Sequence, residues 1–201
     1  MNKDNFEHKS KSWDMNSKRV KNAKSIGDLI VKNVDLKENY SIMDFGAGTG
    51  LLTYFIAPYV AKITAIDNSP SMLMEFKNKQ SEFECETLIV EKDLSKESLD
   101  EKFDGIISSM TIHHLENIEK LFEKFYNMLT PNGFIAIADL DSEDGSFHSD
   151  NVGVYHYGFN RQELENIVKK AGFVNIEFNL ASNINKPNGN FTVFLMTAFK
   201  K

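Results

Sequence analysis

The chain has little cysteine and no long apolar run. Its 201 residues include one cysteine, Cys85, so no disulfide can form within the chain. We therefore expect a reducing compartment and a cytoplasmic protein. No apolar stretch approaches the roughly 18 residues that a membrane-spanning helix needs, so we expect no membrane partner. Residues 1–5 are polar and include an acid, which is not the pattern of a secretory signal.

Basic residues are scarce over most of the chain. The net charge of −6 disfavours broad binding to a phosphate backbone, and we predict no nucleic-acid partner. Residues 1–37 are the exception, with nine Lys or Arg against five Asp or Glu. Lys18, Arg19, Lys21 and Lys24 lie close together on a predicted helix. They form either a solvated face or part of a lid that offers positive charge to an anionic substrate.

Three glycines at alternate positions follow an apolar segment. Residues 42–45 read Ile-Met-Asp-Phe, and Gly46, Gly48 and Gly50 come directly after them. Glycine lets the backbone pass close to a ligand because no Cβ stands in the way. Asp67 closes the next apolar run, about 20 residues on, where nucleotide-binding α/β folds hold a ribose diol. The pattern predicts a site for an adenosine-containing cofactor.

The spacing of these glycines distinguishes between cofactors. The dinucleotide fingerprint is G-x-G-x-x-G, whereas here the motif is Gly46-x-Gly48-x-Gly50, with Asp44 just before it. A carboxylate there repels a pyrophosphate but suits an amino group or another cation. The motif resembles the D-x-G-x-G-x-G motif of the class I S-adenosylmethionine-dependent methyltransferases. The resemblance covers about residues 36–200, and the aromatic lead-in at residues 6–14 resembles the ubiquinone-biosynthesis-like branch.

Strand and helix patterns alternate along the chain, which predicts an α/β fold with a mainly parallel sheet and helices on both faces. The resemblance implies a Rossmann-like sheet of seven strands, with the last strand antiparallel and inserted beside the sixth. Strands are expected near residues 41–45, 62–67, 87–90, 103–108, 134–138, 173–180 and 191–199.

We expect one structural domain. Residues 1–35 would form an N-terminal helical lid segment, and residues 36–201 the S-adenosylmethionine-binding domain. A turn is predicted at 130–133, and an Asn-Pro-Gly-rich loop between the last two strands. The long segment 140–159 is predicted to be a second lid, because of its aromatic content.

The resemblance implies a site for S-adenosyl-L-methionine, with S-adenosyl-L-homocysteine as the product. Asp44 would hold the α-amino group, Asp67 both ribose hydroxyls, and Asp93 the adenine amino group. Met72 and Leu94 would pack on the two faces of the adenine. The predicted cofactor-binding residues are Asp44, Gly46, Ala47, Gly48, Gly50, Asp67, Asn68, Met72, Asp93, Leu94, Ser109 and Met110.

Two adjacent histidines follow the fourth predicted strand. The stretch 109–115 resembles the His-His turn of small-molecule O-methyltransferases that act on sugars and natural products. The resemblance implies that His113 is a base, oriented by Asp139 at the end of strand five, with His114 in the same catalytic set. Alternatively, the histidines cap the following helix or pack against the sheet.

A metal site is a further option, with Asp139, Asp141 and the histidines as ligands. Adjacent histidines diverge on a strand or a helix, and the spacing is not typical of metal ligands, so we predict no metal. His148 and His156 also lie in segments expected on the substrate side. Trp13 is either an anchor for the first helix or a wall of the substrate pocket, and Tyr155 and Tyr157 are candidate pocket residues.

We predict a methyltransferase that acts on a small molecule, at oxygen in the first instance, with nitrogen and carbon left open. Residues 108–111 lack the N-P-P-Y-type signature of exocyclic-amine methylation. A nicotinamide-dependent oxidoreductase is disfavoured by the glycine spacing and the C-terminal hairpin. A cofactor-binding module without catalysis, and a nucleic-acid methyltransferase with a basic face, remain alternatives. The oligomeric state is not predicted.

Overall fold

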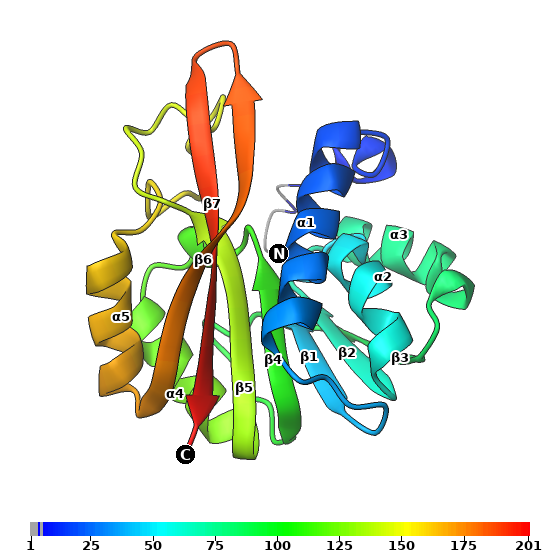
Figure 1. The fold of residues 1–201 in the computed structure, drawn as a ribbon. Coiled ribbons are helices and arrows are strands. Elements are labelled where there is room, and N and C mark those ends of the chain that lie inside the picture. The colour runs from blue at the N-terminus through cyan, green and yellow to red at the C-terminus, as the bar shows by residue number, and fades with distance from the viewer. Residues whose placement is uncertain (1–3, 5) are drawn as a thin grey trace.

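A computed structural model describes residue 4 and residues 6–201 of the chain (Figure 1). Residues 1–3 and 5 of the expected lid segment lie outside the described residues. Seven strands form one sheet in the order β3-β2-β1-β4-β5-β7-β6. The strands are β1 (Ser41–Phe45), β2 (Lys62–Asp67), β3 (Glu86–Glu91), β4 (Phe103–Ser109), β5 (Leu129–Leu140), β6 (Phe173–Lys186) and β7 (Gly189–Lys200).

Helices cover both faces of this sheet (Figure 1). The α-helices are α1 (Ser17–Asn33), α2 (Leu51–Ile56), α3 (Pro70–Asn78), α4 (Ile118–Met128) and α5 (Arg161–Lys170). Residues of α4 and α5 share one apolar core with the sheet, and those of α1 and α2 share the other. The predicted seven-stranded α/β architecture is confirmed, with β7 antiparallel and inserted between β5 and β6.

Short polar side chains cap the first turns of α1, α3, α4 and α5. Ser69 accepts a hydrogen bond from the amide of Met72 and precedes Pro70, which is the first residue of α3. Asn160 accepts from the amides of Gln162 and Glu163 at the start of α5. These caps satisfy amides in the first turns of α3 and α5 that have no partner within the helix.

Strand order reverses beside β1. This strand pairs in parallel with β2 on one side and with β4 on the other. The chain runs outward from β1 to β2 and β3, and then returns to β4. Ligands of open α/β sheets bind at such a reversal, outside the carboxyl ends of the strands. The glycine turn after β1 and the residues that end β2 and β4 are therefore placed at one crevice.

The sequence prediction was wrong on two local points. The turn predicted at 130–133 lies within β5, where pairing with β4 shifts between Phe103 and Gly105, and Asn132 takes a φ of 63°. The loop predicted between the last strands is almost entirely strand, because β6 and β7 pair as far as Lys186 and Gly189. The residues near the tip of this hairpin are mostly polar, so a prediction based on hydrophobic pattern does not identify them as strand. In the described residues, no helix is long and apolar enough to cross a membrane.

Candidate functional site

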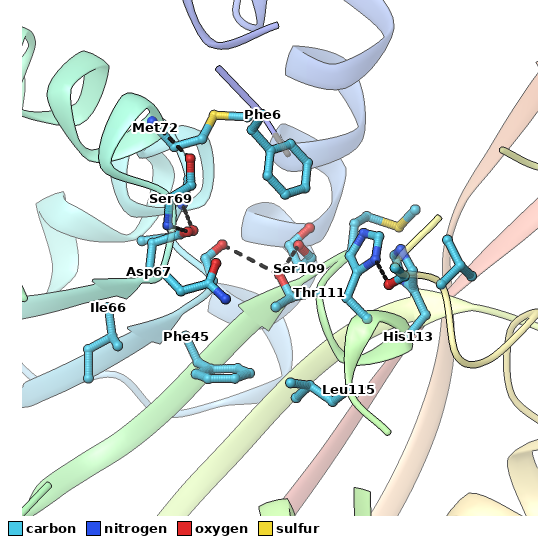
Figure 2. Close-up of a pocket in the computed structure, with 18 of the residues that line it drawn as sticks. Phe6, Phe45, Ile66, Asp67, Ser69, Met72, Ser109, Thr111, His113 and Leu115 are labelled. Carbon is cyan, nitrogen blue, oxygen red and sulfur yellow. Dashed lines mark hydrogen bonds between the residues drawn. The ribbon is translucent and has the colours of Figure 1, made fainter. Parts of the chain in front are cut away.

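A large cleft lies at the carboxyl ends of β1, β2 and β4 (Figure 2). Its volume of about 1340 Å³ exceeds the roughly 300–1,000 Å³ of an ordinary small-molecule pocket, so a cofactor and a second molecule have room. The cleft is lined by the glycine turn, the ends of β2 and β4, the first part of α1, the loop after β5 and the end of β6.

All three motif glycines adopt left-handed backbone conformations, with φ of 69° at Gly46, 54° at Gly48 and 86° at Gly50. Their surroundings differ. A Cβ on Gly46 would collide with the side chain of Thr111. A Cβ on Gly50 would collide with the rings of Phe76 and Phe83. A Cβ on Gly48 would meet nothing within 4 Å, so it would project into open space. Gly48 thus leaves a bare stretch of backbone at the cleft.

Asp67 joins the end of β2 to the glycine turn. Its Oδ2 accepts from the amide of Gly48 at 2.8 Å, and its Oδ1 from the amide of Ser69 at 2.9 Å (Figure 2 shows the Asp67 to Ser69 corner). Burial raises the pKa of Asp67, although these amide hydrogen bonds act against the shift. Each carboxylate oxygen keeps a second acceptor position, so hydroxyl groups of a ligand can still donate to this side chain.

Asp44 is more deeply buried than its predicted role requires. The residue is 1% exposed, and its Oδ2 accepts from the hydroxyl of Thr53 at 2.6 Å. Burial raises the pKa of Asp44 to about 7, the hydrogen bond from Thr53 opposes this, and the charge of Asp67 adds to it. Asp44 still borders the cleft. Removal of this carboxylate from water is unfavourable unless a cation approaches it.

The predicted adenine pocket is assembled in part. Met72 and Leu94 are both buried and both line the cleft. The Asp93 carboxylate also borders the cleft, but it accepts from the amide and hydroxyl of Ser95 and pairs with Lys96 at 2.7 Å. Burial raises the pKa of Asp93, but these partners outweigh burial and hold it below its usual value. The remaining predicted residues that line the cleft are Ala47, Asn68, Ser109 and Met110.

His113 and Asp139 form a buried pair. His113 is 1% exposed and Asp139 is fully buried. Nδ1 of His113 lies 2.7 Å from Oδ1 of Asp139, and the amide of Leu140 also donates to that oxygen. Burial raises the pKa of Asp139, but His113 and the amides outweigh it, so the carboxylate stays ionised. An ionised carboxylate only accepts, so His113 donates from Nδ1, and its Nε2 is a buried atom with no partner among the described residues.

Two more histidines complete a cluster with His113. One ring nitrogen from each of His113, His114 and His148 lies within 4.8 Å of those of the other two. Nδ1 of His114 bonds to the carbonyl of Gly153 at 2.7 Å. Burial, and then the other two histidines, lower the pKa of His148 to about 4. The sequence placed His148 on the substrate side but not beside His113, because the irregular segment 140–159 offers no period from which to place it.

The ligand set considered from the sequence is not assembled. Asp141 accepts two hydrogen bonds from Arg161, at 2.6 and 2.8 Å, and a third from Thr192. His156 bonds through Nε2 to the carbonyl of Leu115. The group with the spacing to hold a cation, among the residues that the structure describes, is instead the cluster of three histidines.

Several described residues of the N-terminal segment line the cleft. Asp4 accepts from the hydroxyl of Ser69 and from the amide of Ser71, both in the region of α3. Phe6 packs edge-on against Trp13 and His114, at ring-centroid distances of 5.9 and 6.0 Å. Figure 2 shows Phe6 beside Met72 in the upper part of the view. The N-terminal segment thus contacts both the candidate adenine pocket and the histidine cluster.

Comparison with known proteins agrees with this geometry. Residues 43–135 match the family model described as methyltransferase domain. The chain is 32% identical to an uncharacterised methyltransferase of Schizosaccharomyces pombe, over 73% of this chain and 58% of that protein. It is 26% identical to a malonyl-[acyl-carrier protein] O-methyltransferase of Calditerrivibrio nitroreducens, over 79% of this chain and 62% of that one. The chain therefore spans about three fifths of these relatives.

A solved structure shares the fold. Phosphoethanolamine N-methyltransferase 2 of Haemonchus contortus, in complex with S-adenosyl-L-methionine, superposes with a TM-score of 0.71 at 18% identity, over 98% of this chain and 59% of that one. Residues 43–135 thus match a methyltransferase domain, and the fold is that of the class I S-adenosylmethionine-dependent methyltransferases. The cofactor of this family is S-adenosylmethionine, as the sequence predicts, and the residues present fit it. Gly48 has no Cβ to fill the cleft, Asp67 retains acceptor positions, and Met72 and Leu94 provide apolar walls.

The methyltransferase offers a matched pair of glycine substitutions. Gly48→Ala places a methyl group in open space and adds only the strain of a left-handed alanine, about 1–2 kcal/mol. We expect this variant to fold but to bind S-adenosylhomocysteine at least about tenfold more weakly, since the methyl group blocks the backbone approach. Gly46→Ala adds a collision with Thr111 and should lose more stability. Thermal unfolding and calorimetric titration test both; cofactor binding by Gly48→Ala at wild-type affinity would contradict the assignment.

The buried Asp44 predicts a pH effect on stability. Its pKa is raised from 3.8 to about 7 in the folded protein, so between these values the folded state binds more protons than the unfolded state. Stability should therefore fall as the pH rises through this window, by up to about 1.4 kcal/mol for each unit of pKa shift. Asp44→Asn removes this titration and should flatten the profile. Urea unfolding of the apoprotein at several pH values measures it, and parallel profiles for the two proteins would refute the account.

Proposed function

We propose that this methyltransferase transfers a methyl group from S-adenosylmethionine to a small-molecule acceptor, at oxygen. The observation that carries the proposal is the His113–Asp139 pair: Nε2 of His113 is buried without a hydrogen-bond partner among the described residues, and His113 lines the same cleft as the glycine turn. When bound, S-adenosylmethionine supplies a methyl group that its sulfonium already activates. The protein then has to hold the two reactants in line, exclude water and remove a proton from the acceptor.

The cofactor would be held from the ends of β1, β2 and β3. In this arrangement Asp67 accepts from the ribose hydroxyls while the amide of Gly48 keeps its carboxylate in place. Asp44 is a buried carboxylate two residues before Gly46, and a bound α-amino group would favour its ionised form. Asp93 would accept a hydrogen bond from the adenine amino group, either in addition to its contacts with Ser95 and Lys96 or in place of them. Met72 and Leu94 would enclose the base.

His113 is proposed as the base. Asp139 fixes the tautomer in which Nδ1 carries the proton, so the lone pair of Nε2 is free to accept a proton from a hydroxyl group. His114 is held by the carbonyl of Gly153 and borders the same space, and we assign it to binding the acceptor. The alternative in which His113 or His114 caps the following helix is not favoured, because Asn117 caps α4.

Two segments are proposed to exclude water. The first is the N-terminal part of residues 1–35, where Asp14 accepts from the hydroxyl of Thr49 at 2.5 Å and pairs with Lys79. The rest of that segment is anchored, because Ile26 and Ile30 of α1 are fully buried. The second is the segment 140–159, which supplies His148 to the cleft. Both would act as lids on one structural domain, residues 36–201 forming its methyltransferase part.

Oxygen is favoured over nitrogen by the buried base, since a hydroxyl nucleophile gains from proton removal during transfer. The relatives named above include one O-methyltransferase and one N-methyltransferase. We expect a cytoplasmic enzyme with no nucleic-acid partner.

Calorimetric titration with S-adenosylhomocysteine and with NAD⁺ tests the proposal first. Binding of S-adenosylhomocysteine without NAD⁺ binding supports it, and the reverse result contradicts it. Turnover is then measured as S-adenosylhomocysteine release with a panel of hydroxylated and amine metabolites. Tight cofactor binding with no turnover on any acceptor favours a binding module, and RNA binding that falls steeply with salt favours a nucleic-acid enzyme.

His113→Ala should leave cofactor affinity within about twofold and slow transfer about 10²–10⁴-fold, the usual contribution of a general base. Asp139→Asn should also slow transfer, because it permits the wrong tautomer of His113. Both variants are measured by single-turnover rates with an acceptor identified in the metabolite panel. Thr192→Ala serves as a control, since it removes a hydrogen bond to Asp141 and touches neither partner of the pair. A transfer rate in His113→Ala equal to that of the wild type would show that His113 is not the base.

The histidine cluster allows a direct test for a metal requirement. We expect EDTA treatment to leave transfer unchanged, because the proposed chemistry needs only a proton acceptor. Added Zn²⁺ should instead inhibit, since the three histidines would hold it on the lone pair that accepts the proton. His148→Ala should weaken that inhibition. Loss of activity on chelation, with recovery on adding a divalent ion, would show that the methyltransferase uses a metal.

A further inference from the structure

Three cations gather where the start of α1 meets the end of β6. Lys18 and Arg19 lie in the first turn of α1, Lys186 is the last residue of β6, and all three line the cleft. Nζ of Lys18 donates to the carbonyl of Asn185 at 3.0 Å, which holds the two elements together. In Figure 1 the first turns of α1 and the tall β6–β7 hairpin face each other above the sheet.

This cationic group is not neutralised within the described residues. None of the three forms an ion pair with a described carboxylate. Asp14, the carboxylate that acts on Arg19, is paired with Lys79. Glu143 acts on Lys186 but does not line the cleft, and it accepts from the amide of Phe147.

The local electrostatics are unfavourable without a ligand. The N-terminus of a helix carries partial positive charge, which favours acids in the first turn and disfavours cations. The first turn of α1 has no acidic residue and contains both Lys18 and Arg19. Burial and the charges of Arg19 and Lys18 also lower the pKa of Lys186. A chain with a net charge of −6 thus concentrates like charges at one end of its cleft, a departure from local rules that is typical of functional sites.

Aromatic rings hold two of these cations in position. The guanidinium carbon of Arg19 lies 3.7 Å from the centre of the Trp13 ring, and Nζ of Lys186 lies 3.7 Å from that of Phe147. Such contacts orient a cation without cancelling its charge. No hydrogen bond to the Arg19 guanidinium occurs within the described part of the chain, so its donor fork is available for a bidentate acceptor such as a carboxylate or phosphate.

The same rings connect the cations to the proposed base. The Phe147 ring lies 4.8 Å from that of His148, which lies 5.0 Å from that of His113. A molecule that lies along these rings has one end at His113 and the other at the cations.

We propose that Arg19 and Lys186, assisted by Lys18, bind an anionic group of the methyl acceptor, a carboxylate or a phosphate. The inference rests on the proposed function, because it assigns the substrate class of that site. The acceptor is then a hydroxylated small anion. Its charged end sits between α1 and the hairpin, and its hydroxyl group is directed to Nε2 of His113.

The first test titrates the S-adenosylhomocysteine complex with inorganic phosphate and, separately, with acetate, in low-salt buffer. We expect saturable binding of at least one anion. Arg19→Gln and Lys186→Gln should weaken it at least about tenfold, because each loses a charge-assisted contact. Lys32→Gln is the matched control, since it makes the same change at an exposed lysine in the last turn of α1. Cofactor affinity, measured for all variants, should stay within about twofold and reports that each has folded.

The second test uses matched acceptors, each a hydroxy acid or sugar phosphate with its neutral amide or free sugar. Turnover should favour the anionic member, and Arg19→Gln should raise the KM for that member more than it lowers kcat. Cofactor binding without anion binding, or equal anion affinity in wild type, Arg19→Gln and Lys186→Gln, overturns this inference and leaves the proposed function standing. Absence of cofactor binding by the wild-type protein overturns the proposed function instead.

Discussion

The contact between the Asp67 carboxylate and the Gly48 amide is the constraint on which the site depends. It ties the end of β2 to the turn after β1, and it does so at the reversal of strand order, where the sheet opens into a crevice. A side chain on Gly48 would project into that crevice. The same carboxylate also accepts a hydrogen bond from the amide of Ser69. The hydroxyl of Ser69 caps α3 and so positions Met72. One acidic side chain therefore organises the turn, the helix start and the wall of the predicted adenine pocket.

The acceptor side depends on longer-range contacts. His113 follows β4 and Asp139 ends β5, and parallel pairing of these strands brings the two residues together. The cations come from the opposite ends of the sequence, α1 and the β6–β7 hairpin, and are joined through the carbonyl of Asn185. Because β7 is inserted between β5 and β6, the hairpin stands beside the loop that carries Phe147 and His148. The fold thereby places the cations proposed to bind an anion and the proposed base in one cleft.

Much of this arrangement could be predicted from the sequence, because several of its residues directly follow predicted strands. Gly46, Gly48 and Asp67 lie at strand ends, where a parallel sheet fixes the position of a residue from its place in the chain. The His113–Asp139 pair was predicted from the family resemblance, and the structure brings the two side chains together. The approach of His148 could not be predicted, because the segment 140–159 has no periodic pattern. The length of the hairpin was hidden by its polar sequence, and the hydrogen bond from Thr53 to Asp44 depends on the first turn of α2 rather than on the motif.

A crystal structure of the methyltransferase with S-adenosylhomocysteine tests the central claim most directly. The account predicts that the ribose hydroxyls reach the Asp67 carboxylate, that the amino-acid part lies along Gly46 and Gly48, and that the thioether sulfur points toward His113. Density for the ligand elsewhere in the cleft, with Asp67 and Gly48 out of contact with it, would contradict the account.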